Sequence, residues 1–125
     1  MSFEEALRTR IKAAIAGAAP VEWESRKGYP CIVLSIVTQS IGRHMTGDDG
    51  LRSPRVQIDA LALDNPTKVA LRDAAVAAIT PAGVVGGVRF GRAQQLRWSN
   101  ASEQTDTDFV FREMIEAVLP HQLET

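Results

Sequence analysis

The stretch Leu51-Arg52-Ser53-Pro54-Arg55-Val56-Gln57-Ile58-Asp59-Ala60 decides the fold. From Arg55 onward, polar and apolar residues alternate, which is the pattern of a strand with one buried face. A polar turn, Gly47-Asp48-Asp49-Gly50, precedes it, and Asn65-Pro66 follows it. Asn is favoured at a helix N-cap and Pro at the first helical position, so a helix is expected to begin there. The stretch therefore predicts the middle of a small domain that combines strands and helices.

A first helix is predicted over residues 2–18. Ser2 and Glu5 have the spacing of a capping box, in which each side chain hydrogen-bonds the backbone of the other. Gly17 and Pro20 are expected to end the helix. Apolar residues recur at every fourth position and predict one buried stripe, Phe3, Leu7, Ile11 and Ile15.

A second helix is predicted from Asn65, as N-cap, to about Ile79. It is rich in alanine, and small side chains let a helix lie close to a sheet. Pro81 and Gly83 end it. The side predicted to face the sheet consists of Val69, Ala70, Ala74, Ala77 and Ala78.

The remaining segments predict strands. Cys31–Val37 is nearly all apolar and predicts a strand covered on both faces. Glu113–Leu119 is compatible with either strand or helix. The other predicted strands are a short one at Val21–Trp23, one from Val88 to about Trp98 after a Gly86-Gly87 turn, and a last one from Thr107 to about Val118.

This order of elements predicts a single domain over residues 1–125. The fold class is α+β, with two helices packed on one face of a mostly antiparallel sheet of four to five strands. The chain between residues 44 and 51 is polar and turn-like, and it predicts the tip of a long projecting hairpin.

Composition disfavours several classes of protein. The chain has 125 residues and a net charge of −1, so it has no basic field that would attract DNA or a membrane surface. Ser2-Phe3-Glu4-Glu5 is acidic where a signal peptide is basic, and no apolar run approaches the roughly 18 residues of a membrane span. The single cysteine, Cys31, is expected to be a small buried apolar residue.

One glycine-rich segment approximates a phosphate-binding loop. Gly86 and Gly91 have the required spacing, but Arg92 and Ala93 stand where that motif has Lys and Ser or Thr. A strand is also predicted to follow, whereas phosphate binding needs a helix N-terminus. A hairpin turn is therefore the favoured interpretation.

Metal and catalytic motifs are equally weak. Asp48-Asp49-Gly50 and Asp106-Thr107-Asp108 lack the ligand spacing of a calcium loop. His44 and His121 provide too few nitrogen donors for zinc. No G-x-S-x-G sequence is present to form a nucleophile elbow. We therefore expect no enzymatic activity, no cofactor and no metal site.

Two groups of polar residues suggest surfaces. Arg89, Arg92 and Arg97, with Trp98, form a basic stretch without an acid, whereas residues 103–116 are acidic. The basic stretch fits a solvated sheet face, a nucleic-acid surface, or a strip that pairs with the acidic segment of an identical neighbour. Arg55, Gln57 and Asp59 share one strand face, which fits either simple exposure or hydrogen bonds between subunits.

Six segments, in this order and spacing, resemble the small tail-completion family of tailed phages, which includes tail terminators and head–tail joining proteins. The resemblance covers most of the chain. At the C-terminus it is weaker, because Glu113–Leu119 is longer and more helix-compatible than the family's final strand. The segments are Phe3-Glu4-Glu5-Ala6-Leu7-Arg8, Tyr29-Pro30-Cys31-Ile32-Val33-Leu34, Gly50-Leu51-Arg52 into Arg55-Val56-Gln57-Ile58-Asp59, the helix Thr67 to Ile79, Gly86-Gly87-Val88-Arg89, and Asp108-Phe109-Val110-Phe111.

The resemblance implies a structural virion protein without catalytic residues or cofactors. Family members form a ring, usually of six subunits, which caps the tail tube and joins it to the neck. The implied partners are other copies of the chain, the tail tube protein and a head–neck connector, with DNA only as passing cargo and no membrane. The implied location is the tail–neck junction of a virion assembled in the host cytoplasm. Gene transfer agents and prophages carry similar proteins.

The sequence thus predicts a tail terminator or head–tail joining ring. The alternative is a small ligand- or nucleic-acid-binding module that uses Arg89, Arg92, Arg97 and Trp98. For the ring, the residues predicted to contact other subunits or partner proteins are Arg43, His44, Met45, Asp48, Asp49, Arg52, Arg55, Gln57, Asp59, Arg89 and Arg92.

Overall fold

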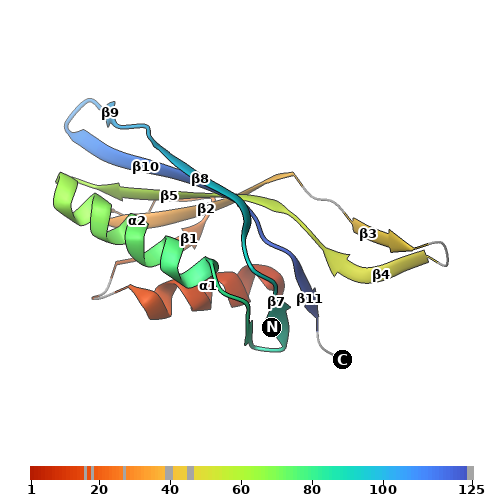
Figure 1. The fold of residues 1–125 in the computed structure, drawn as a ribbon. Coiled ribbons are helices and arrows are strands. Elements are labelled where there is room, and N and C mark those ends of the chain that lie inside the picture. The colour runs from red at the N-terminus through yellow and green to blue at the C-terminus, as the bar shows by residue number, and fades with distance from the viewer. Residues whose placement is uncertain (16, 18, 27, 39–40, 45–46, 124–125) are drawn as a thin grey trace.

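The computed structural model describes residues 1–15, 17, 19–26, 28–38, 41–44 and 47–123. They form two helices and two sheets, so the predicted α+β class is confirmed (Figure 1). The strands are more numerous than predicted, because they divide between a six-stranded and a five-stranded sheet. We call these the large sheet and the small sheet.

The large sheet has the strand order β1-β2-β5-β10-β8, and β9 pairs with β10. β1 runs parallel to β2, and the other pairs are antiparallel. Ile58, in the stretch that decides the fold, lies opposite Leu34 on one side and Ile115 on the other. The strands of this sheet are β1 Val21–Trp23, β2 Cys31–Thr38, β5 Arg55–Ala62, β8 Gln94–Asn100, β9 Glu103–Gln104 and β10 Phe109–Val118.

Helix α1, Phe3–Ala14, is shorter than the predicted range but begins as predicted. The Ser2 hydroxyl accepts a hydrogen bond from the Glu5 amide at 3.1 Å and donates to the Glu5 carboxylate at 3.2 Å. The four residues of the predicted apolar stripe are all buried, which confirms that face of the helix. Burial of such a stripe is the main source of stability for a helix of this length.

Helix α2, Asn65–Ile79, differs from the prediction in its cap and in its buried face. The N-cap is Asp64, whose carboxylate accepts from the Thr67 amide at 2.9 Å and has its pKa lowered by that bond. Ala70 and Ala77 are exposed. The predicted face was only partly right, since Ala74 and Ala78 pack at the border of the core. The buried residues are Lys68, Leu71, Ala75 and Ile79, and the lysine among them concealed this face in the sequence.

The core lies between the two helices and one face of the large sheet. Leu7 and Ile11 of α1 and Ile79 of α2 pack there with the inward side chains of β2, β5 and β10. The opposite face of the sheet has a small apolar cluster around Cys31, and Arg55, Gln57 and Asp59 form a polar row along β5. The prediction that β2 is covered on both faces is therefore wrong at its C-terminal end, where Val37 is 47% exposed.

The small sheet has the order β3-β4-β11-β7-β6. Gly86 and Gly87 have φ values of 54° and 80° and form the predicted turn between β6 and β7. The predicted strand from Val88 to Trp98 is broken at residues 91–93, because the Gly91 amide donates to the Pro120 carbonyl at 2.8 Å. Its two halves, β7 and β8, therefore belong to different sheets. The small-sheet strands are β3 Ile41–His44, β4 Gly47–Arg52, β6 Gly83–Val85, β7 Val88–Phe90 and β11 His121–Leu123.

Strands β3 and β4 form a two-stranded ribbon that we call the arm. Figure 1 shows the arm reaching away from the helices. At its base Arg52 pairs with both Ile41 and His121, and beyond that point the described residues of β3 and β4 pair only with each other. The sequence predicted a projecting hairpin but placed turn structure over residues 44–51, whereas Gly47–Arg52 is strand. The C-terminal ambiguity is also resolved, since β10 continues to Val118.

Candidate functional site

A buried ion group joins α2 to the large sheet. Glu113 on β10 is 4% exposed and accepts from Lys68 at 3.1 Å and from Arg72 at 3.2 Å. The Arg72 guanidinium also donates to Asp73, and this hydrogen bond raises the pKa of Arg72. The same guanidinium lies 5.6 Å from the centre of the Trp98 ring. Both carboxylate oxygens of Glu113 are thus paired, as a buried charge requires. The group connects helix, strand and sheet edge, and its role is structural.

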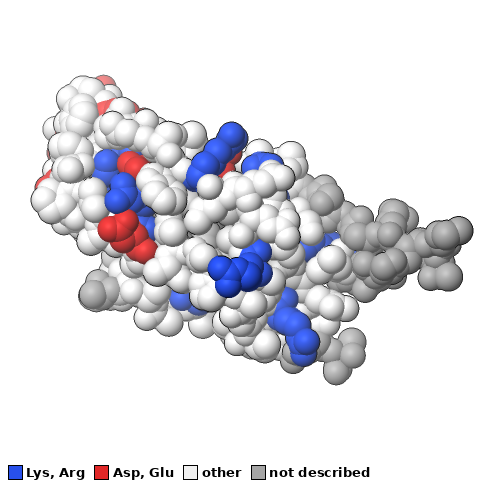
Figure 2. Space-filling view, in the orientation of Figure 1, with Lys and Arg blue, Asp and Glu red and all other residues white. Residues whose placement is uncertain are grey.

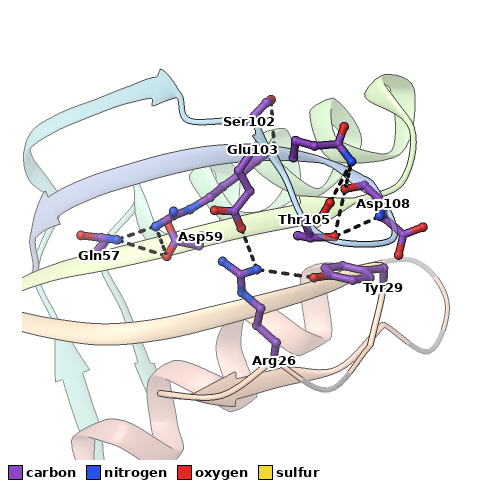
Figure 3. Close-up of polar contacts among 10 residues, drawn as sticks. Arg26, Tyr29, Gln57, Asp59, Ser102, Glu103, Thr105 and Asp108 are labelled. Atoms are coloured by element: carbon purple, nitrogen blue, oxygen red, sulfur yellow. Dashed lines mark hydrogen bonds and ion pairs between the residues drawn. The ribbon is translucent and has the colours of Figure 1, made fainter.

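The open face of the large sheet carries a second polar network (Figure 3). Arg112 donates to Asp59 at 3.1 Å, and the Gln57 amide donates to the same carboxylate at 3.1 and 3.3 Å. Arg55 donates to the side chain of Gln95. The three predicted interface residues of β5 are therefore bonded within the chain, and Asp59 is only 8% exposed.

One end of this face is covered by the segment that contains β9. Glu103 forms a 2.7 Å ion pair with Arg26, which also donates to the Tyr29 hydroxyl at 3.4 Å (Figure 3). The Ser102 hydroxyl accepts from the Arg112 amide at 3.2 Å. These contacts tie the acidic segment to the N-terminal third of the chain, and its Glu103 is already occupied by Arg26.

The predicted interface residues separate into three places. Arg43 and His44 lie on β3, and Asp48, Asp49 and Arg52 lie on β4, so the arm holds the largest group of them. Met45 lies outside the described residues. The β5 residues lie on the open face of the large sheet, while Arg89 lies on β7 and Arg92 follows it before β8.

The predicted basic surface is not assembled. Arg89 belongs to the small sheet, whereas Arg97 and Trp98 belong to the large one. Arg97 pairs with Glu116 at 2.6 Å, and Trp98 packs instead under the helix-borne Arg72. Figure 2 shows acidic atoms gathered toward the α2 side of the viewed face, while basic atoms are spread more widely. Arg89, Arg92 and Arg97 therefore do not form one continuous basic strip for a nucleic-acid backbone.

A shallow groove of about 520 Å³ lies on the small sheet, lined by residues of β4, β6, β7 and β11. Beneath it His121 stacks on Phe3 at 3.9 Å between ring centroids and lies next to the Leu119 carbonyl, 3.3 Å from Nδ1. Burial lowers the pKa of His121. The ring is therefore a buried core group that joins the small sheet to α1, a role that the sequence did not suggest.

Within the described ranges, no three His, Cys, Asp or Glu side chains are grouped so that they could hold a metal ion. None of the helices in the described part of the chain is both long and apolar enough to cross a membrane.

Comparison with known proteins gives one informative result. No protein-family model matches the chain, and no curated protein sequence is significantly similar. Among solved structures, the fold is similar to that of a chain in a structure described as the virion of a native gene transfer agent particle. The TM-score is 0.52 with 13% sequence identity, over 99% of this chain and 96% of the other. At this identity the similarity concerns the fold.

Proposed function

We propose that this chain is a structural virion protein, a tail terminator or head–tail joining protein that forms a ring between the tail tube and the neck. The observation that carries the proposal is the fold similarity to a gene transfer agent virion chain, which covers nearly the whole length of both chains. With 99% of this chain and 96% of the other covered, the similarity goes beyond a shared core motif.

The layout of polar residues supports a structural role. Glu113 and Asp59, the two acids that are buried among the residues of described exposure, are both paired with basic side chains of the same chain. Residues used in this way hold the fold together and are not poised for reaction. The arm, in contrast, reaches away from the helices, and a surface placed there suits contact with a neighbouring subunit.

A ring would act by geometry. In a head-to-tail interface each copy presents one surface to the copy before it and a different surface to the copy after it, and such an interface closes when the rotation matches. One side of the ring would fit the tube protein and the other a neck protein, which stops tube growth. The proposed stoichiometry is six copies, with DNA passing through the hole.

The test is removal of the gene from a strain that produces the particles, followed by electron microscopy. We expect tails of uncontrolled length and heads without tails, with normal particles restored when the gene is returned on a plasmid. Particles with joined heads and tails of normal length in the absence of the gene would contradict the proposal.

A further inference from the structure

We propose that the arm of one copy pairs, antiparallel, with the open edge strand β8 of a second copy. The inference rests on the proposed ring, because it names the contact between successive subunits. It joins two strand edges, one from the small sheet and one from the large sheet, that have no strand partner among the described residues.

The edge at β8 is unusually open. Six of its seven residues are exposed, including Trp98 at 47%, and only Leu96 is half-buried. The opposite edge of the same sheet is protected, because β1 is short and the Trp23 indole donates to a carbonyl of α1, that of Glu4, at 2.9 Å. An exposed row of backbone amides and carbonyls is a template for another strand.

Few of the usual protections against pairing occur along β8. It contains neither lysine nor proline, and its one irregularity, at Gln95 with φ 52°, lies near its start. A hollow of about 280 Å³, lined in part by Ser99 and Met114, adjoins the strand and leaves room for side chains of an added strand. The stretch from Leu96 to Asn100 is thus available for a regular ladder.

The arm needs a partner for a different reason. A two-stranded ribbon is marginally stable by itself in water and gains stability from a third strand or a packed surface. Further from the body than Arg52, the described residues of the arm have no third strand from their own chain beside them. Because β3 is the outer strand of the small sheet, its free edge can accept one from a neighbour.

The partner is a second copy of the chain. The two open edges, β3 and β8, lie in different sheets of one chain, and a head-to-tail ring joins two different surfaces of that chain. Antiparallel pairing of β3 with β8 places His44, the last residue of β3, opposite the Gln94 end of β8.

Disulfide trapping tests the contact. One preparation carries His44→Cys and a second carries Gln94→Cys, and the two are mixed and mildly oxidised. The native Cys31 is 1% exposed and stays unreactive. We expect a crosslinked dimer only in the mixture. The matched control, Thr107→Cys mixed with His44→Cys, uses an exposed residue of the β9–β10 connection and should give none.

The same trapping is carried out on concentrated protein and on purified particles, so that a chain that assembles only on tails is also tested. Absence of the 44–94 crosslink in both settings, or an equal yield with Thr107→Cys, would overturn the inference. If the crosslink forms but particles lacking the gene are normal, the contact stands and the proposed function fails. If the crosslink is absent but particles lacking the gene are defective, the proposed function stands and the proposed contact is rejected.

Discussion

The body of the molecule and its arm are stabilised in different ways. The body, made of the two helices and the large sheet, has a continuous core and pairs its buried acids internally. The arm is attached at its base, where Arg52 pairs with His121, and its described residues otherwise pair only within the ribbon. The difference indicates that folding depends on the body, while the arm is available for assembly.

The largest expected effect on stability comes from the buried ion group of the body. Glu113→Ala leaves the ammonium of Lys68 buried without its acid, and breaking a buried pair in this way costs about 3–5 kcal/mol. The measurement is the free energy of unfolding in urea. If the loss were below about 1 kcal/mol, the body would not depend on this group as we infer.

A matched control for this variant lies three residues further along β10. Glu116→Ala also removes a carboxylate from an arginine, but Arg97 has 73% of its side chain exposed. The Glu116 side chain is only 16% exposed, but its loss leaves behind a solvated arginine and no buried charge. The cost should therefore be near the upper end of the 0–1 kcal/mol range of exposed pairs, about 1 kcal/mol. The difference between the two losses in unfolding free energy shows how much of the effect comes from burial of the remaining charge and how much from removal of a carboxylate.

The contact of His121 with Phe3, which links the small sheet to the body, predicts that the free energy of unfolding depends on pH. His121 is buried, and burial lowers its pKa below the 6.5 of the free side chain. The unfolded chain then binds the proton more readily than the folded one, so stability is complete above about pH 6.5 and falls as the pH decreases toward the folded-state pKa. The contribution is at most about 1.4 kcal/mol per pH unit.

His121→Phe tests this contribution, because an aromatic ring is kept against Phe3 while the titrating group is removed. Nearby charges on Glu4 and Arg52 also act on the histidine, so the informative quantity is the difference between the two proteins. Unfolding in urea at pH 7.5, 6.5 and 5.5 should give a shallower loss for the variant. Parallel losses would show that His121 carries no such penalty.

A smaller effect is expected at the start of α1. Ser2→Ala removes the hydroxyl that accepts from the Glu5 amide, which costs about 1 kcal/mol for a typical N-cap. Thr9→Ala, at an exposed position within the same helix, should be neutral or slightly stabilising because alanine is the better helix former. Thermal unfolding followed by circular dichroism compares the two, and equal changes would argue against the cap.

The sequence predicted what local patterns determine. The fourfold spacing from Phe3 to Ile15 gave the buried face of α1, and two glycines gave the β6–β7 turn. It failed for α2 because Lys68 is buried only through Glu113, which is 45 residues away in sequence. An ion pair between distant elements leaves no periodic signal, and a lysine at that position indicates exposure.

The division into two sheets was also hidden. Val88 to Trp98 looks like one strand, but the break depends on a hydrogen bond from Gly91 to Pro120, which lies beyond β10. For the candidate surface, the sequence identified polar residues of the arm. It could not show that β8 is an exposed edge strand. Exposure of an edge follows from the strand order, and only the fold specifies that order.

Removal of the arm tip, residues 44–50, tests the separation of folding from assembly most directly. The smallest effect on stability is expected here, with a free energy of unfolding within about 0.5 kcal/mol of the native value, because the core is untouched. In a particle-producing strain the shortened protein should be present and folded, yet tails should be uncapped and unjoined to heads. Infectious particles with normal tails would contradict the account.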